Sequence, residues 1–188
     1  GGWAAKDPSW DLFCAFLCKD GLSIDKSPLY NPRKPFENRD PRCTKTIVEF
    51  QTNHLGFMYQ PHPDTLKCYS FKSSKYVTNN DNRANAQYAS FNGLLWKKGI
   101  DNDWVDDNKS DPDKIIIRYA DVLLIYAEAK IELNEIDQTV LDAINQVRAR
   151  AYGVKLAQTS AYPAITTTDQ AELRKTLRIE RRMEFTLE

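Results

Sequence analysis

The chain has 188 residues, with 26 basic and 26 acidic side chains and a formal net charge of zero. This length allows one domain with a substantial hydrophobic core. The absence of a basic excess argues against nucleic-acid binding through bulk electrostatics. No apolar run approaches the roughly 20 residues that span a bilayer, and no segment has the pattern of a signal peptide.

The first third of the chain predicts one short helix, then a loop, then a strand. Residues Trp10–Lys19 place apolar side chains on one face of a short helix. Residues 21–43 contain one glycine and four prolines, which favour a loop. The β-branched residues of Thr44–Phe50 predict a strand.

The middle third predicts long loops. Residues Tyr69–Val77 fit either a further short strand or an irregular segment, while the Asn-rich residues 78–87 and the polar residues 92–107 fit loops. The predicted loops of the whole chain together hold most of its aromatic and amide side chains. Long loops are uncommon in compact domains unless they have a function, so this distribution indicates where function resides.

The four cysteines do not have the paired spacing of a zinc site. Cys14 and Cys18 are one helical turn apart, and Cys43 and Cys68 follow far downstream. We expect free or partly buried thiols, with a disulfide between distant cysteines as the open alternative. Because only two histidines could complete a metal site, we expect no metal and no cofactor.

The last third predicts helices. Tyr119, Val122, Leu123 and Tyr126 recur at the helical period and predict the apolar stripe of a helix within residues 116–130. Asn134 is the expected end of this helix. The chain therefore begins an antiparallel helical hairpin here.

The second helix of the hairpin is predicted from its caps and its period. Asp137 or Thr139 is the expected N-cap, and apolar residues repeat at the helical period from Val140 to Ala151. Gly153 lies where a left-handed C-cap is expected. Helical hairpins of this size are the unit of tetratricopeptide repeats, although one copy alone does not establish a repeat.

A third helix is predicted to begin after Asp169, with Glu172 reaching back to complete a capping box. Its pattern contains no stop signal before Glu188. We therefore expect the helix to continue past the last residue and the chain to be truncated at its C-terminus.

No catalytic constellation is predicted. The two histidines lie in one loop-like region, and no glycine-rich phosphate loop is present. Glu180 and Glu184 could act as an acid/base pair, but the neighbouring arginines keep carboxylates ionised. A salt-bridged helix is the better interpretation, with Asp121 or Glu128 as further partners.

Three stretches of sequence occur together and in order. They are Asp20–Ile24 with Tyr30–Pro32 and Pro35–Arg42, then Ile116–Ala129, then Leu141–Ala151 with Glu172–Arg174 and Glu180–Phe185 downstream. With them the chain resembles the SusD/RagB family of outer-membrane glycan-binding lipoproteins. Family members are longer and begin with a lipidated cysteine, so the resemblance is to their C-terminal portion.

The resemblance implies a fold that is mainly α, with long irregular loops and a few short strands. It implies a loop-rich glycan-binding region over residues 1–110. It also implies a tetratricopeptide-like helical region over residues 111–188, which contains the hairpin.

The resemblance also implies a function without catalysis. Such proteins bind oligosaccharide at the cell surface as partners of a SusC-like TonB-dependent transporter in polysaccharide utilisation. The expected location is the outer membrane, reached through a lipid anchor outside this chain, and no nucleic-acid partner is expected. The alternatives are a helical-repeat interaction scaffold that binds no sugar, and a glycoside hydrolase with two facing carboxylates.

A sugar presents an apolar face and a rim of hydroxyls, so its site needs an aromatic platform bordered by amide, carboxylate or guanidinium groups. By type and position, the candidate ligand-binding residues are Trp3, Trp10, Tyr30, Asn31, Arg33, Trp96 and Trp104. In the Phe36–Arg42 loop, Arg39 or Asp40 could contact ligand. A loop locked by Asp/Arg pairing is the favoured interpretation.

Overall fold

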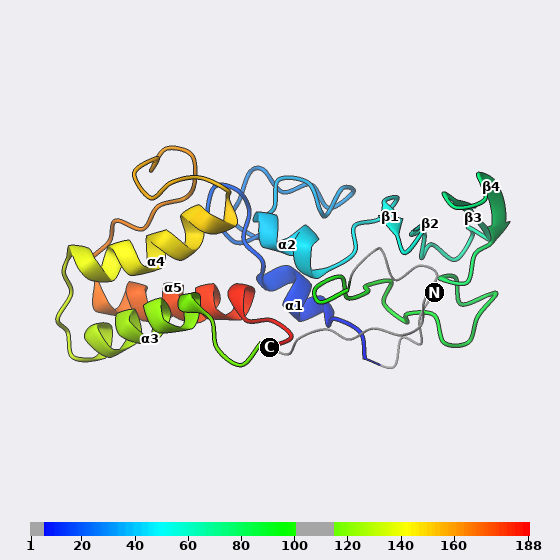
Figure 1. Cartoon of the computed structure of the whole chain (residues 1–188). Helices are drawn as coiled ribbons and strands as arrows, with labels where there is room; N and C mark the ends of the chain where they lie inside the picture. Colours follow the sequence, from blue (N-terminus) through cyan, green and yellow to red (C-terminus); the bar gives the residue numbers. More distant parts are fainter. Residues whose placement is uncertain (1–5, 101–114) are drawn as a thin grey trace. The chain divides into compact units, whose positions relative to one another are not determined.

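A computed structural model describes residues 6–100 and 115–188. The chain forms two compact units, the first made of Gly1–Phe13 and Thr44–Asp113 and the second of Cys14–Cys43 and Lys114–Glu188. The helices of the described residues are α1 (Trp10–Ala15), α2 (Pro41–Thr46), α3 (Tyr119–Glu132), α4 (Gln138–Ala151) and α5 (Gln170–Glu184) (Figure 1). The strands are β1 (Asn53–His54), β2 (Phe57–Met58), β3 (Lys67–Ser70) and β4 (Lys75–Thr78). The predicted class, mainly α with a few short strands, is confirmed.

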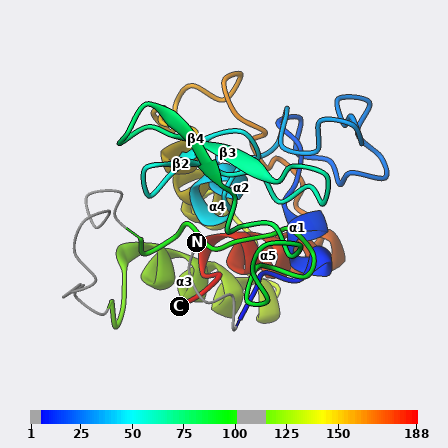
Figure 2. The same ribbon diagram turned by 90° about the vertical axis from the view of Figure 1, so that its right-hand side faces the viewer.

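The first unit contains a small antiparallel sheet in the order β1-β2-β3-β4 (Figure 2). The Tyr69–Val77 segment, predicted as a strand or an irregular piece, is a hairpin in which Tyr69 pairs with Tyr76 and Cys68 with Val77. Ser74 has φ 52°, the left-handed conformation that reverses the chain between β3 and β4. Each strand is only two to four residues long, so most of this unit is loop.

The strand predicted over Thr44–Phe50 is wrong. Thr44–Thr46 is the second half of α2, and beyond it only Ile47 makes an isolated bridge, to Trp96. The helix forms because Asp40 and Pro41 together start it. The Asp40 Oδ1 atom accepts a hydrogen bond from the Arg42 amide at 2.9 Å, and proline suits the first helical position. This local start outweighs the β propensity of the residues after it.

The second unit contains α3, α4 and α5, and the predicted caps of α3 and α4 are confirmed. The Asp137 side chain accepts hydrogen bonds from the Thr139 and Val140 amides at the start of α4. Asn134, at φ 57°, and Gly153, at φ 70°, adopt the left-handed conformation after α3 and α4. Each cap satisfies backbone groups that a helix end leaves without an intrahelical partner.

At α5 the predicted N-cap, Asp169, is confirmed, but the predicted capping box with Glu172 and the predicted end of the helix are wrong. The Asp169 side chain accepts from the Glu172 amide, whereas Glu172 accepts a hydrogen bond from the Thr167 hydroxyl at 2.7 Å. The helix ends at Glu184 instead of continuing through Glu188, and Phe185 is its C-cap. The Thr186 hydroxyl bonds the carbonyl of Arg182, which satisfies a terminal backbone group without the glycine that sequence analysis relies on.

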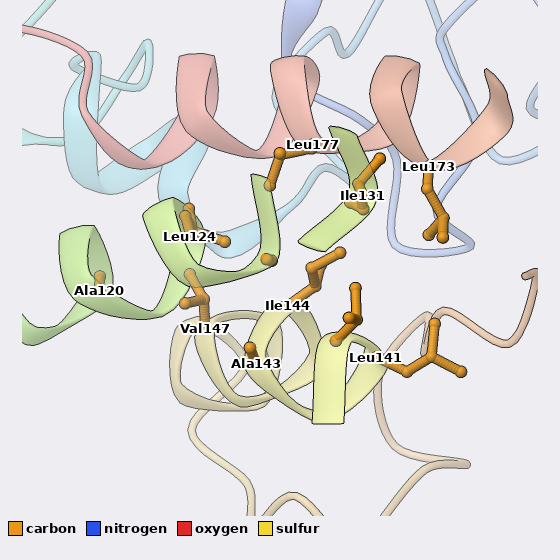
Figure 3. Close-up of a cluster of buried hydrophobic side chains, with 11 residues drawn as sticks. Ala120, Leu124, Ile131, Leu141, Ala143, Ile144, Val147, Leu173 and Leu177 are labelled. Atoms are coloured by element: carbon orange, nitrogen blue, oxygen red, sulfur yellow. The ribbon is translucent and has the colours of Figure 1, made fainter. Parts of the chain in front are cut away.

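The core of the second unit lies between α3, α4 and α5 (Figure 3). Leu124 and Ile131 of α3 meet Ile144 of α4 and Leu173 and Leu177 of α5, and these side chains are almost completely buried. Small residues on the same face of α3 let the neighbouring helices approach closely. They are Ala120 and Ala127.

The stripe predicted to face this core was wrong. Tyr119, Val122 and Tyr126 are exposed, Tyr119 by 66%, and only Leu123 packs partly against the core. The face that is buried carries Leu124 and Ile131 instead. Periodicity could not choose between the faces because α3 is apolar on nearly all sides.

A buried network of charges links the N-terminal loop of the second unit to α4 and α5. Glu180 is completely buried and accepts hydrogen bonds from Arg42 Nη1 at 2.6 Å and Arg148 Nε at 2.7 Å. Arg42 also donates two hydrogen bonds to Asp40, from Nε to Oδ1 at 2.9 Å and from Nη2 to Oδ2 at 2.8 Å. The predicted locking of the Phe36–Arg42 loop by Asp/Arg pairing is therefore confirmed.

Glu184 is the second buried carboxylate of this network. It accepts hydrogen bonds from Arg42 at 3.1 Å and Arg118 at 2.7 Å, and it also pairs with Arg150. The predicted pairing of this helix with Glu128 is confirmed by Arg181, whose Nη1 lies 3.8 Å from Glu128 Oε2. Glu180 and Glu184 are therefore structural ion-pair partners rather than an acid/base pair.

All four cysteines keep their thiols, which is one of the two predicted states. Cys18, Cys43 and Cys68 are buried, and Cys14 is partly exposed. Among the described helices, none combines the length and the apolar character that crossing a membrane requires.

Candidate functional site

A pocket of about 490 Å³ opens in the loops of the first unit, and we call it the Phe91 pocket. This volume is within the usual range for small-ligand sites, about 300–1,000 Å³. Four stretches of chain line it: residues 50–51, 60–63, 82–84 and 90–93. The lining residues are Phe50, Gln51, Gln60, Pro61, His62, Pro63, Asn82, Arg83, Ala84, Ser90, Phe91, Asn92 and Gly93.

Two fully buried asparagines hold the loop at residues 60–65. The Asn82 Nδ2 atom donates to the carbonyls of His62, Pro63 and Thr65 at 2.8, 2.7 and 3.1 Å. The Asn79 Nδ2 atom donates to the carbonyls of Gln60 and Thr65, both at 2.7 Å. Because prolines cannot continue a β-ladder, the carbonyls of this segment need other donors, and the asparagine amides supply them.

Gly93 and Tyr59 hold the opposite wall. Gly93 has φ 73°, and a Cβ atom there would lie 3.3 Å from Pro61, so glycine permits both the turn and the close approach. The buried Tyr59 hydroxyl donates to the Gly93 carbonyl at 2.8 Å. Burial, with a further contribution from Asp81, raises the pKa of Tyr59 far above its usual value, so the phenol stays protonated as a donor.

Phe91 is 82% exposed, yet its ring is held in place. The Arg83 guanidinium carbon lies 3.5 Å from the ring centroid, which is a close cation–π contact. Arg83 is itself held, because its Nη1 atom donates to the carbonyls of Gln87 and Ala89 at 2.8 and 2.9 Å. The result is an exposed aromatic ring with a fixed position at the edge of the pocket.

Amide groups line the same pocket as this ring. Gln51 is exposed and Gln60 is partly exposed, so both present their side chains at the pocket. Asn92 is fixed by its own bonds: its Nδ2 atom donates to the Pro8 carbonyl at 2.8 Å and its Oδ1 atom accepts from the Leu94 amide at 2.9 Å. A flat ring with amide donors and acceptors beside it is the arrangement that a sugar requires.

The Phe91 pocket does not have the groups of a glycoside hydrolase of the usual kind. Such an enzyme needs two carboxyl groups facing each other across the scissile bond. None of the described residues that line the pocket is Asp or Glu. The arrangement can bind a sugar, but its lining offers no carboxyl pair for hydrolysis.

Trp10 and Trp96, two candidates from the sequence, belong to the first unit but do not line the Phe91 pocket. Trp10 is half exposed, and its ring centroid lies 5.1 Å from that of Phe13. Trp96 is half buried and bridges Ile47. Trp3 and Trp104 lie outside the described residues. A ligand role for these tryptophans stays a prediction.

The remaining candidates, Tyr30, Asn31 and Arg33, lie together in the second unit. Asn31 Oδ1 accepts from the Arg33 amide at 3.0 Å, which makes a local turn. The Tyr30 ring lies 5.5 Å from the guanidinium carbon of Arg39. These contacts describe an ordered loop, and its contact with ligand stays a prediction.

Sequence reasoning missed Arg83 and Phe91. The sequence did contain one indication of this site. The Asn-rich loop at residues 78–87 lies shortly before Phe91, and the prolines at 61 and 63 disfavour a strand. Asparagines beside a proline segment indicate side-chain bonding to loop carbonyls. Arg83 and Phe91 are eight residues apart in irregular chain, so no sequence periodicity predicts that their side chains stack.

Comparison with known proteins identifies the family to which the chain is similar. The model of the SusD family matches residues 1–188, the whole chain. The crystal structure of a SusD-like carbohydrate-binding protein from Bacteroides fragilis NCTC 9343 superposes with a TM-score of 0.73 at 32% sequence identity. That match covers 99% of this chain and 34% of the other, so this chain corresponds to about a third of that protein. None of the curated proteins compared with the chain matches it.

Proposed function

Because the chain belongs to the SusD family, we propose that it binds oligosaccharide in the Phe91 pocket without catalysing a reaction. The observation that carries this proposal is the exposed Phe91 ring, held by Arg83 beside the amides of Gln51 and Gln60. Burying a phenylalanine side chain stabilises a fold by about 1.5–3 kcal/mol, and an exposed phenylalanine does not contribute this stabilisation. A ligand that covers the ring explains why it is held there.

The chemistry of the pocket suits a sugar. The apolar C–H face of a pyranose ring packs against the face of an aromatic ring, while its hydroxyls exchange hydrogen bonds with amides. Gln51 and Gln60 offer both donors and acceptors, as sugar hydroxyls do. Preformed loops lower the ordering cost of binding, and here Asn79 and Asn82 fix the loop before any ligand arrives.

Phe91→Ala should weaken oligosaccharide binding by about tenfold or more, equivalent to about 1.4 kcal/mol. The substitution removes the platform but touches no core packing, so the fold should be unchanged. Isothermal titration calorimetry of the chain against a panel of plant, host and microbial oligosaccharides measures the effect. Tyr76→Ala is the matched control, because Tyr76 is 69% exposed on β4 and does not line the pocket.

Two results would count against this proposal. A folded chain that binds no oligosaccharide of the panel would favour the alternative of an interaction scaffold. Equal losses in the Phe91→Ala and Tyr76→Ala variants would mean that the sugar does not use the Phe91 ring specifically.

We also propose that the chain acts at the cell surface as a lipoprotein partner of a SusC-like TonB-dependent transporter in the outer membrane. Membership of the SusD family supports this proposal. So does the apolar outer face of α3, formed by Tyr119, Val122, Ile125 and Tyr126, because large exposed apolar patches are typical of protein contacts. On this proposal the α3–α4 hairpin is tetratricopeptide-like and residues 111–188 scaffold protein contact, while residues 1–110 bind glycan.

Charge placed on the outer face of α3 should disrupt this association. Val122→Glu with Ile125→Glu should reduce copurification with a SusC-like transporter by about tenfold, because buried unpaired carboxylates are costly. Glycan binding by the same variant should be unchanged. Transporter association at the normal level would remove this face from the proposal.

A further inference from the structure

We infer that the Phe91 pocket selects an acidic oligosaccharide, one with a uronate carboxylate placed against Arg83. This inference rests on the proposed function and names the class of sugar. It follows from three features of the pocket: the sign of its charge, the way Arg83 is held, and the position of Arg83 on the platform itself.

The lining of the pocket carries positive charge only. Arg83 is permanently charged, while none of the described lining residues is acidic. Two aspartates lie nearby. Asp64 is exposed, with its Oδ2 atom 3.9 Å from His62 Nδ1, and burial raises the pKa of the Asp81 carboxyl. A sugar carboxylate entering the pocket therefore meets a permanent cation and no lining carboxylate.

The guanidinium of Arg83 is held by one nitrogen only. Within the described part of the chain, its hydrogen bonds come from Nη1, which donates to the carbonyls of Gln87 and Ala89. A guanidinium has five N–H donors in a planar fork that matches a carboxylate. Fixing Nη1 orients this fork in advance, and the donors of Nε and Nη2 remain for a ligand.

The positive charge of Arg83 lies directly at the aromatic ring on which a sugar would pack. The Arg83 guanidinium carbon lies 3.5 Å from the Phe91 ring centroid, so the cation covers one face of the ring. A sugar that packs along the uncovered edge of Phe91 can place one of its ring substituents beside the guanidinium. A hexuronic acid carries its carboxylate as a ring substituent at C5, within reach of such a neighbour. A neutral hexose has a hydroxymethyl group in that place, which gives a weaker, uncharged hydrogen bond.

The test compares an acidic sugar with its own neutral ester. Oligogalacturonate and oligomannuronate, each as free acid and as methyl ester, keep the same ring and linkage while the charge changes. We expect at least one of the two acids to bind about tenfold more tightly than its ester in calorimetry at low salt, with the preference falling as salt rises. Arg83→Gln should bring the ratio of the two affinities close to one, and Arg83→Lys should leave it between these values.

Lys75→Gln is the control, because it removes an exposed cation of β4 that does not line the pocket, and the acid/ester ratio should stay at the wild-type value. Equal affinity of acid and ester for the wild-type chain, or an unchanged ratio in Arg83→Gln, overturns this inference. If the chain binds only neutral oligosaccharides and Phe91→Ala abolishes this binding, the inference is overturned but the proposed function is supported. A folded chain that binds no oligosaccharide at all overturns the proposed function itself.

Discussion

Replacing Glu180 by glutamine should lower the free energy of unfolding by about 3–5 kcal/mol, the cost of breaking a buried ion pair from one side. Glu180 is completely buried and neutralises Arg42 and Arg148, which are buried as well. Glutamine keeps the shape of the side chain, so the loss would report charge rather than a cavity. The two arginines would then share fewer carboxylates in a medium that solvates cations poorly.

Urea denaturation followed by circular dichroism measures this loss. Glu132→Gln is the matched control, because Glu132 also lies on a helix and pairs with an arginine, Arg174, at 2.6 Å, but at the surface. Exposed pairs contribute little because water and salt screen them. We therefore expect a much smaller change for Glu132→Gln than for Glu180→Gln. Similar changes for both would mean that the Glu180 network does not hold the second unit together.

Asn82→Asp should lower the free energy of unfolding by about 3 kcal/mol, because a buried amide donor becomes an acceptor facing other acceptors. The Asn82 Nδ2 atom donates to the carbonyls of His62, Pro63 and Thr65, and aspartate of the same shape can donate to none of them. These carbonyls belong to a wall of the Phe91 pocket, so glycan affinity should fall together with stability.

Asn85→Asp provides the comparison for this change. The Asn85 Nδ2 atom also donates to two carbonyls, those of Leu66 and Asn79, both at 2.9 Å, but Asn85 is exposed. Water can replace its bonds, so we expect a smaller loss of stability in thermal or urea denaturation. An Asn82→Asp variant as stable as the parent chain would show that the loop at residues 60–65 is held by other contacts.

The helix boundaries of the second unit were largely predictable because they depend on local chemistry. Asp137, Asp169 and Gly153 cap their helices through bonds within a few residues of sequence. The face that α3 buries was not predictable, since that depends on where other helices lie. Leu124 and Ile131, seven residues apart, are buried, and Tyr119 and Tyr126, also seven apart, are exposed, so both stripes have the helical period.

The candidate site was predictable in kind but not in position. Loops rich in aromatics and amides were predicted to bind ligand, and the pocket that we propose as the site lies in such loops. Its platform was not among the predicted tryptophans and tyrosine, because what distinguishes Phe91 is its stack on Arg83. That contact depends on how Arg83 is fixed by the carbonyls of Gln87 and Ala89, which is a property of folded loops rather than of residue type.

The structure of the chain with an oligosaccharide bound tests the central claim most directly. Our account predicts a sugar ring packed on Phe91, with carbon atoms of the two rings in contact at about 4 Å. It also predicts sugar hydroxyls on Gln51 or Gln60 and, for an acidic sugar, a carboxylate on Arg83. A sugar bound instead at Trp10, Trp96 or Tyr30, with Phe91 still in solvent, would contradict the account.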